Sequence, residues 1–214
     1  MEISLIIPCL NEARTISQVI NDCIKYYGAD SQIIIVDNGS TDGSQNIIQT
    51  LAQSNSNLLY LECGNKGKSN AIKFALIRVK YNDVVLQDGD NEYSIQDTAQ
   101  IALMHLSGAY DMSIGVRTNK MLLRSTLANY LVRTVILLKF GKTLPDVLTG
   151  SRVVKLDLLK RCNSKQFGLE TELTKIAIRD KLKIQTAECK YQPRTKGKKI
   201  KAKHLSEILW CALS

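Results

Sequence analysis

Residues 84–90 read Val84-Val85-Leu86-Gln87-Asp88-Gly89-Asp90, a short apolar run that ends in a glycine between two acids. Apolar, β-branched runs of this length, bounded by turn residues, are typical of buried strands. Three similar runs precede it, at residues 3–7, 33–36 and 58–61. Together the four runs predict four buried strands, and the first is expected to stop at Pro8 because proline cannot donate to a sheet ladder.

Amphipathic helical patterns separate these runs, because apolar side chains recur at helical spacing between them. They are Ile16, Val19, Ile20, Cys23 and Ile24, then Ile47, Ile48 and Leu51, then Ala71, Ile72, Ala75, Leu76 and Val79. Strands that alternate with helices predict an α/β fold with a largely parallel sheet. The second half is less regular, with helices expected at 95–106, 122–140, 170–179 and 207–213 and strands at 112–116, 152–154 and 184–191.

Length and composition favour one domain with a substantial core, since the chain has 214 residues of which 44% are hydrophobic. The six cysteines are scattered without a C-x-x-C pair, which predicts reduced thiols in a cytoplasmic protein. The first residues form no signal peptide, and no stretch reaches the roughly 20 apolar residues of a membrane span. We therefore expect a soluble protein or one that is peripheral at the membrane.

Charge is strongly basic, with a formal net charge of +9. Nine basic side chains and one acid, Glu188, lie between Lys181 and Lys203. A run of this kind fits a solvated face, a phosphate-bearing substrate or a membrane surface. Because aromatic residues do not interleave with it, we expect no nucleic acid partner. The apolar segment 122–140, which contains Arg124, Arg133 and Lys139, fits either a core helix or a helix at a membrane interface.

Three polar loops follow predicted strands directly, at residues 8–12, 37–40 and 88–92. Ligands of open parallel sheets bind at the carboxyl ends of the strands, so we expect the acids of these loops to share one rim. The carboxylates of Asp88 and Asp90 are hard oxygen ligands suited to Mg²⁺ or Mn²⁺. Taken alone, Asp-Gly-Asp is also typical of a plain turn. A glycine-rich dinucleotide fingerprint and a P-loop are both missing from the sequence, which disfavours a nicotinamide or ATP enzyme.

The order of these motifs resembles the inverting family 2 glycosyltransferases of GT-A fold, and within them most of all the polyprenyl-phosphate (dolichol-phosphate) mannosyl- and glucosyltransferases. The motifs are Ser4-Leu5-Ile6-Ile7-Pro8-Cys9-Leu10-Asn11-Glu12, Ile35-Val36-Asp37-Asn38-Gly39-Ser40-Thr41-Asp42-Gly43, Asn65-Lys66-Gly67-Lys68, Asp88-Gly89-Asp90, Gly150-Ser151-Arg152 and Arg194-x-x-Gly197-x-Lys199. The resemblance implies a Rossmann-like three-layer α/β/α sandwich with a mostly parallel central sheet. We expect this glycosyltransferase domain at residues 1–200, followed by a basic, amphipathic helix at 201–214.

The resemblance also implies the site residues. Those that bind the nucleotide-sugar would be Pro8, Leu10, Glu12, Asp37, Lys68, Asp88, Gly89, Asp90, Arg117, Arg194 and Lys199. The metal ligands would be Asp88, Asp90 and Glu92, and the residues nearest to the chemistry would be Asp90, Arg117 and Asp146. Arg194 and Lys199 would lie on a substrate-covering loop, where Lys198-Lys199-Ile200 replaces the Ser-Lys of the family.

The activity implied by the resemblance is inverting transfer of one sugar from a UDP- or GDP-sugar to a polyprenyl phosphate at the cytoplasmic face of the membrane, with Mg²⁺ or Mn²⁺ as the cofactor. A lipid phosphate is already an anion and needs no general base, whereas a hydroxyl acceptor does. Two alternatives stay open at this point. One is transfer to a hydroxyl of a glycan, wall polymer or protein, and the other is a nucleotide-sugar-binding module without turnover.

Overall fold

The computed structural model describes residues 1–64, 67–119, 122–164, 167–194 and 205–213. Its strands are β1 (Ser4–Cys9), β2 (Gln32–Asp37), β3 (Leu58–Glu62), β4 (Asp83–Leu86), β5 (Met112–Arg117), β6 (Arg152–Lys155) and β7 (Ile184–Cys189). Its helices are α1 (Ile16–Tyr27), α2 (Ser44–Ser54), α3 (Lys68–Ala75), the 3₁₀ helix η1 (Leu76–Arg78), α4 (Ile95–Gly108), α5 (Leu123–Phe140), α6 (Leu156–Lys160), α7 (Leu169–Arg179) and α8 (Leu205–Leu213).

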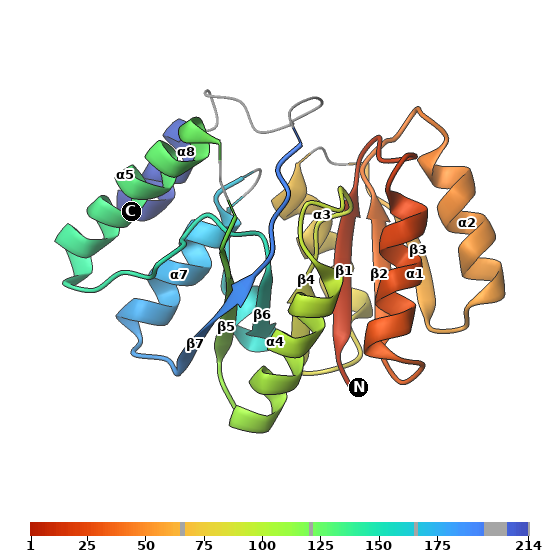
Figure 1. Ribbon diagram of the computed structural model, residues 1–214, viewed down its shortest axis with the longest axis horizontal. Helices are drawn as coiled ribbons and strands as arrows, with labels where there is room; N and C mark the ends of the chain where they lie inside the picture. The colour runs from red at the N-terminus through yellow and green to blue at the C-terminus, as the bar shows by residue number, and fades with distance from the viewer. Residues whose placement is uncertain (65–66, 120–121, 165–166, 195–204, 214) are drawn as a thin grey trace.

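The described strands form one seven-stranded sheet in the order β3-β2-β1-β4-β6-β5-β7 (Figure 1). Neighbouring strands are parallel except for β6, which runs antiparallel to both β4 and β5. The predicted α/β fold with a mostly parallel central sheet is therefore confirmed. Because β1, β2 and β4 are parallel, the loops that follow them meet at one edge of the sheet, and Cys9 lies directly opposite Asp37 in the register.

Helices cover both faces of the sheet, and the strand side chains divide between the two layers by simple alternation. In β2, Ile33 and Ile35 belong to the same buried cluster as side chains of α1, α2 and α4, whereas Ile34 and Val36 belong to the cluster that contains side chains of α3, α5, α7 and α8. Figure 1 shows α1 and α4 in front of the sheet and α3 behind it. A strand buried on both faces explains why the sequence there is a continuous apolar run instead of an alternating one.

The prediction that the first strand stops at Pro8 was wrong. β1 continues through Pro8 to Cys9, and Pro8 pairs with Val36 of β2. On its other side β1 pairs with β4 only from Ser4 to Ile6. Proline is tolerated at position 8 because that flank of the strand has no ladder left to which it could donate.

Helix α5 has one buried face and one exposed apolar face, so it is not simply a core helix. Asn129, Val132 and Ile136 are buried against the domain. The opposite side carries six large apolar side chains that are exposed, Leu123, Leu127, Tyr130, Leu131, Leu137 and Leu138. Among the residues that the structure describes, no helix is both long and apolar enough to cross a membrane.

The structure also places the side chain of His105 and those of the six cysteines. His105 is fully buried near the amino end of β4, where its ring lies 3.0 Å from Oδ1 of Asp83 and 2.9 Å from Oγ of Ser113. Burial lowers the pKa of the His105 ring, which fits a structural histidine. All six cysteines are free thiols, as their scattered positions predict.

Candidate active site

Direct hydrogen bonds join the three polar loops at the carboxyl edge of the sheet. The amide of Asn11 donates to Oγ of Ser40 at 2.9 Å, and the amide of Glu12 donates to Oγ of Ser44 at 2.9 Å. The hydroxyl of Thr15 donates to the carbonyl of Gly89, also at 2.9 Å. Thr15 stands at the N-cap position of α1 but its side chain caps no helix amide, because it ties α1 to the acidic turn instead.

Asp37 ends β2 and is almost fully buried. Its Oδ2 accepts hydrogen bonds of 3.1 Å from the amides of Gly39 and Ser40 and from Nε2 of Gln45. Its Oδ1 is also buried, but has no hydrogen-bond partner among the described residues. A buried acceptor without a partner costs about 1–3 kcal/mol. The carboxylate is therefore held rigidly with one oxygen left to accept from a ligand.

The acidic turn that follows β4 carries Asp88, Asp90 and Glu92. Lys68, at the start of α3, lies with its Nζ 2.6 Å from Oδ1 of Asp88 and 2.8 Å from Oε1 of Glu170. Although burial acts to lower it, the pKa of Lys68 is raised by these two carboxylates. Lys68 thus stays charged and links the acidic turn to α7.

Gly150 allows the loop before β6 to approach the acidic turn closely. A Cβ atom at this position would lie 2.4 Å from Oδ2 of Asp88 and 3.2 Å from Nζ of Lys68. The Gly150 amide donates to the hydroxyl of Tyr93 at 2.8 Å, which fixes the loop there. Only glycine avoids a clash with the carboxylate at this distance.

Arg194 brings a guanidinium group from beyond β7 into the middle of the acids. Its Nη1 and Nη2 donate to the two oxygens of Glu12 at 2.8 and 3.1 Å. The same group lies 3.2 Å from Oδ2 of Asp90 and 3.6 Å from Oε1 of Glu92. The side chain of Arg194 is 27% exposed, so it stands at the mouth of the site and not in the core.

Asp90 keeps an excess of negative charge around it in spite of Arg194. Burial, followed by the carboxylates of Asp88 and Glu92, raises the pKa of Asp90 to about 7, while Arg194 acts in the opposite direction. A carboxyl group with such a pKa lacks compensating positive charge at neutral pH. A cation that entered this turn would be attracted on electrostatic grounds.

Glu92 lies beside Asp90, but its carboxylate is held from the β7 side of the molecule. It accepts hydrogen bonds from the hydroxyl of Tyr191 and, at 3.0 Å, from the amide of Arg194. The rings of Tyr93 and Tyr191 are 5.0 Å apart and tilted. These tyrosines connect the turn after β4 to the strand that precedes Arg194.

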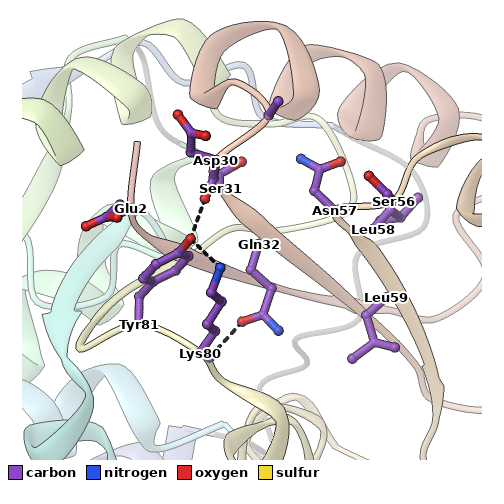
Figure 2. Close-up of a pocket in the computed structure, with 11 residues that line it drawn as sticks. Glu2, Asp30, Ser31, Gln32, Ser56, Asn57, Leu58, Leu59, Lys80 and Tyr81 are labelled. Carbon is purple, nitrogen blue, oxygen red and sulfur yellow. Dashed lines mark hydrogen bonds between the residues drawn. The ribbon is translucent and has the colours of Figure 1, made fainter.

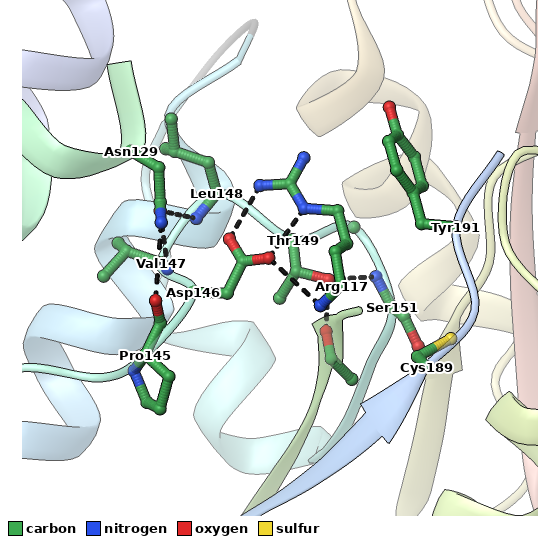
Figure 3. A network of polar contacts seen from close by, with 12 residues as sticks. Arg117, Asn129, Pro145, Asp146, Val147, Leu148, Thr149, Ser151, Cys189 and Tyr191 are labelled. Atoms are coloured by element: carbon green, nitrogen blue, oxygen red, sulfur yellow. Dashed lines mark hydrogen bonds and ion pairs between the residues drawn. The ribbon is translucent and has the colours of Figure 1, made fainter. Parts of the chain in front are cut away.

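Arg117 and Asp146, both predicted near the chemistry, bind each other (Figure 3). Nε and Nη2 of Arg117 donate to the two oxygens of Asp146 at 2.6 and 2.7 Å. Both side chains are more than nine-tenths buried, and the Arg117 guanidinium lies 5.3 Å from the centroid of the Tyr191 ring. Although burial acts to lower it, the pKa of Arg117 is raised by Asp146.

The loop that carries Asp146 is held from two sides. Oδ1 of Asn129 on α5 accepts from the amides of Val147 and Leu148 at 3.0 and 3.2 Å (Figure 3). The fully buried Arg152 donates to the carbonyls of Val147 and Thr149 at 2.6 and 3.2 Å. Asp146 therefore sits on a rigid loop, which fixes Arg117 in turn.

The structure brings most of the predicted site residues together at one rim. Asp37, Glu12, Asp88, Gly89, Asp90, Glu92, Lys68 and Arg194 are connected by the contacts above, and Pro8 adjoins them because its carbonyl lies 3.3 Å from where a Cβ of Gly89 would stand. Leu10 follows β1 in the first of the three loops and is partly exposed. Lys199 lies outside the described residues.

Tyr93 and Tyr191 also belong to this rim, although no motif includes them. Gly150 belongs to the motif Gly150-Ser151-Arg152, and Glu170 joins the rim through Lys68. A signal for Glu170 existed, because this acid stands on the buried side of an amphipathic helix, beside Leu169 and Leu173. An acid in such a register needs a partner, and here the partner is Lys68. No comparable pattern marks the two tyrosines.

A groove elsewhere on the molecule is a poor candidate for the same role. It has a volume of about 600 Å³ and is lined by residues that precede β1, β2, β3 and β4, at the opposite edge of the sheet (Figure 2). Its polar groups bond to each other, since the hydroxyl of Tyr81 donates to the carbonyl of Asp30 at 2.7 Å and Nζ of Lys80 donates to Tyr81 at 2.8 Å. None of the predicted site residues lines it.

The fold and this rim define the class of protein. The chain superposes on glucosyl-3-phosphoglycerate synthase from Mycobacterium tuberculosis with a TM-score of 0.77 and 19% sequence identity, over 99% of this chain and 78% of that one. The match places the structure in the GT-A fold of glycosyltransferases. The family model for glycosyl transferase family 2 matches residues 4–133.

The chain belongs to glycosyl transferase family 2, as the motifs predict. It is 28% identical over 205 residues to glycosyltransferase AglJ of Haloferax volcanii, covering 91% of this chain and 64% of AglJ. It is 26% identical over 204 residues to the low-salt glycan biosynthesis hexosyltransferase Agl6 of the same organism, covering 90% of this chain and 48% of Agl6. The chain thus spans about half to two thirds of the length of these relatives. Family membership argues against a binding module without turnover.

Proposed function

We propose that the chain transfers one sugar from a UDP- or GDP-sugar to a polyprenyl phosphate at the cytoplasmic membrane face, with Mg²⁺ or Mn²⁺ as its cofactor. The observation that carries the proposal is the acidic turn, in which Asp88 and Asp90 are faced by Lys68 and Arg194. The clustered carboxylates suit a metal ion, and the two neighbouring cationic side chains suit the diphosphate that the ion accompanies. The M. tuberculosis neighbour, crystallised with Mn²⁺ and uridine diphosphate, supports this reading.

The donor set fits a divalent metal ion. Asp88, Asp90 and Glu92 offer hard carboxylate oxygens, and the pKa of Asp90 is raised by burial and then by the two neighbouring carboxylates. Within the described ranges no three such side chains already point at a common centre, because Lys68 and Arg194 hold them. When bound, the ion would stabilise the negative charge that develops on the leaving nucleoside diphosphate.

The remaining roles fall to the protein's own side chains. Oδ1 of Asp37 would accept a hydrogen bond from the nucleoside, since it is a buried acceptor at this rim without a partner among the described residues. Lys68 and Arg194 would exchange their carboxylate partners for phosphate oxygens. Arg117, fixed by Asp146, would present its charge behind Tyr191 and so add to the positive field at the donor.

The chemical class of the acceptor is inferred from whether an acid near the rim is free to act as a general base. A hydroxyl acceptor needs a general base within hydrogen-bond reach. Asp146, an acid near the rim that could serve, is committed to a buried, bidentate ion pair with Arg117. A phosphate oxygen attacks without such a base, which favours a phosphate acceptor over a hydroxyl.

A hydroxyl acceptor is the alternative, and the names of relatives favour it. Agl6 is a glycan biosynthesis hexosyltransferase, and another relative is a poly-β-1,6-N-acetyl-D-glucosamine synthase from Staphylococcus aureus. Incubation with a radiolabelled nucleotide-sugar and polyprenyl phosphate, followed by extraction into chloroform and methanol, separates the two. We expect label in the organic phase, and label that stays only in aqueous glycan would reject the lipid acceptor.

Nucleotide binding gives the most direct check of the donor site. At a concentration about 100 times its Kd, a nucleotide stabilises the folded state by about 2.7 kcal/mol, which for a chain of this size raises Tm by about 5–10 °C. We expect that shift with either UDP or GDP in the presence of Mn²⁺, and a smaller one after EDTA is added. Equal shifts with and without the metal would contradict the role of the acidic turn.

Asp37→Asn should weaken nucleotide binding while the fold persists. The exchange replaces one carboxylate oxygen by an NH₂ group, which cannot accept a hydrogen bond, so we expect a loss of about 1–3 kcal/mol, or about 5- to 160-fold in Kd. Titration calorimetry with the nucleotide and Mn²⁺ measures it. Asp22→Asn, on the exposed side of α1, is the matched control and should leave Kd unchanged.

A further inference from the structure

Two helices at one end of the molecule carry an apolar surface that the domain does not cover. On α5, Leu127 is 59% exposed and Leu138 is 82% exposed. The exposed side chains of α5 recur at i, i+4, i+7 and i+8, and the last two positions recur one heptad further. They form one stripe along about 23 Å of helix. Exposed apolar stripes of this length mark interaction sites.

Helix α8 extends this surface. It packs beside α5 and α7, with Ile208 and Ala212 buried, and Nζ of Lys139 on α5 donates to the carbonyl of Leu213 (Figure 1). On its other side Trp210 is 71% exposed and Leu213 is 59% exposed. We call the exposed set of Leu123, Leu127, Tyr130, Leu131, Leu137, Leu138, Trp210 and Leu213 the α5–α8 surface.

Charge along α5 and its flanking loops has one sign. Between Asp111 and Asp146 the sequence contains no acidic residue and six basic ones, Arg117, Lys120, Arg124, Arg133, Lys139 and Lys142. Arg124 and Lys139 are exposed on α5 itself. An exposed apolar stripe flanked by cations matches the hydrocarbon boundary and the anionic headgroups of a bilayer.

A second copy of the chain fits this surface less well. Pairing two copies through the same patch would bring two basic α5 helices together, in molecules whose net charge is +9 each. Like charges at such a contact are unfavourable, whereas anionic lipid removes that cost. Charge complementarity therefore favours an anionic membrane over a second copy of the chain as the partner of the α5–α8 surface.

We propose that the α5–α8 surface docks the enzyme on an anionic lipid bilayer, with the apolar stripe of α5 lying in the headgroup region parallel to the membrane. The inference deepens the proposed function and rests on it for its purpose, since a polyprenyl phosphate must be reached from the bilayer surface. The docking itself is measured without any sugar donor, so the two can fail separately.

Trp210 makes the test specific, because it is the one tryptophan of the chain. The full chain is titrated with 100-nm vesicles of phosphatidylcholine and phosphatidylglycerol at 7:3, and with vesicles of phosphatidylcholine alone. We expect a blue shift of the Trp210 emission and co-sedimentation with the mixed vesicles, and binding that is at least about tenfold weaker to the neutral ones or at high salt. Absence of both signals with the mixed vesicles would overturn the proposal.

Leu127→Glu combined with Leu138→Glu places two acids on the stripe and should lower the partition coefficient about 100-fold. Leu103→Glu is the matched control, since Leu103 is 53% exposed on α4, across the sheet, and should bind vesicles like the wild type. Equal binding of the double variant, or equal loss in the control, would reject the surface. A blue shift that grows with protein concentration in the absence of vesicles would assign the surface to a second copy instead.

The double variant also separates this inference from the function. It should keep the thermal shift with nucleotide and Mn²⁺, because neither leucine touches the acidic rim. If the wild type docks on vesicles but yields no lipid-linked product, the proposed acceptor falls and the docking surface stands. If lipid-linked product forms with detergent-dispersed acceptor but the wild type does not dock, only the docking surface falls.

Discussion

Asp90→Asn should abolish sugar transfer while leaving the protein folded. The exchange keeps the shape of the side chain but removes its charge from the acidic turn, where it lies 3.2 Å from Arg194. Electrostatic stabilisation of a leaving diphosphate by a bound metal is worth several kcal/mol, and each 1.36 kcal/mol is a factor of ten. We therefore expect kcat to fall by about 10³-fold, measured by nucleotide release from the nucleotide-sugar.

In contrast to its activity, the thermal stability of Asp90→Asn should not fall below that of the wild type. Burial and the neighbouring carboxylates raise the folded-state pKa of Asp90 from its ordinary value of 3.8 to about 7. In the metal-free protein its ionised form therefore opposes folding above pH 3.8, and fully so above pH 7. Removing the charge should then keep or raise Tm at pH 8. Asp157→Asn, an exposed acid on α6, is the control and should change neither rate nor Tm. A transfer rate near that of the wild type would reject the assignment of Asp90.

Asp146→Asn should destabilise the fold more than any other single exchange of an acid described above. It removes the carboxylate from a buried, bidentate pair and leaves the guanidinium of Arg117 uncompensated, which costs about 3–5 kcal/mol. For a domain of this size the loss corresponds to about 10 °C in Tm. Urea unfolding at constant pH measures the free energy of unfolding directly.

A double-mutant cycle shows whether the stability lost in Asp146→Asn comes from breaking the ion pair between Arg117 and Asp146. Arg117→Met together with Asp146→Leu removes both charges, so we expect it to recover most of the stability. Asp180→Asn is the matched control, because Asp180 pairs with the exposed Arg179 and should lose no more than about 1 kcal/mol. A loss for Asp146→Asn as small as that of the control would contradict a structural pair. A double variant that folds but does not transfer sugar would support the predicted role of Arg117 at the donor.

The first four strands and their helices could be predicted because their signals are local. Each strand from β1 to β4 is an apolar run closed by a polar loop, and parallel pairing then brings those loops to one edge. The direction of β6 could not be predicted in the same way. Residues 152–154 look like a strand in either direction, and their antiparallel pairing with β4 and β5 depends on contacts made elsewhere in the chain.

The site was partly predictable for the same reason. Asp37 ends β2, and Asp88 and Asp90 lie in the turn that follows β4, so their convergence follows from topology alone. The partners that hold them come from distant segments and leave no local pattern. Lys68 forms an ion pair with Glu170, and Arg117 forms one with Asp146. The partners of each pair lie far apart in the sequence, so no single motif could show that they bind each other. The prediction for Lys199 stays a prediction, since that residue lies outside the described part of the chain.

The contact between Arg194 and Glu12 joins residues that are 182 positions apart. Protein synthesis proceeds from the amino end, so Glu12 leaves the ribosome early and its partner leaves late. Tyr191, which holds Glu92, also belongs to the final part of the described domain. A nascent chain can thus form its first strands and helices long before its acidic rim is complete. The acidic rim can therefore assemble only after the 182 positions that separate Glu12 from Arg194 have been synthesised.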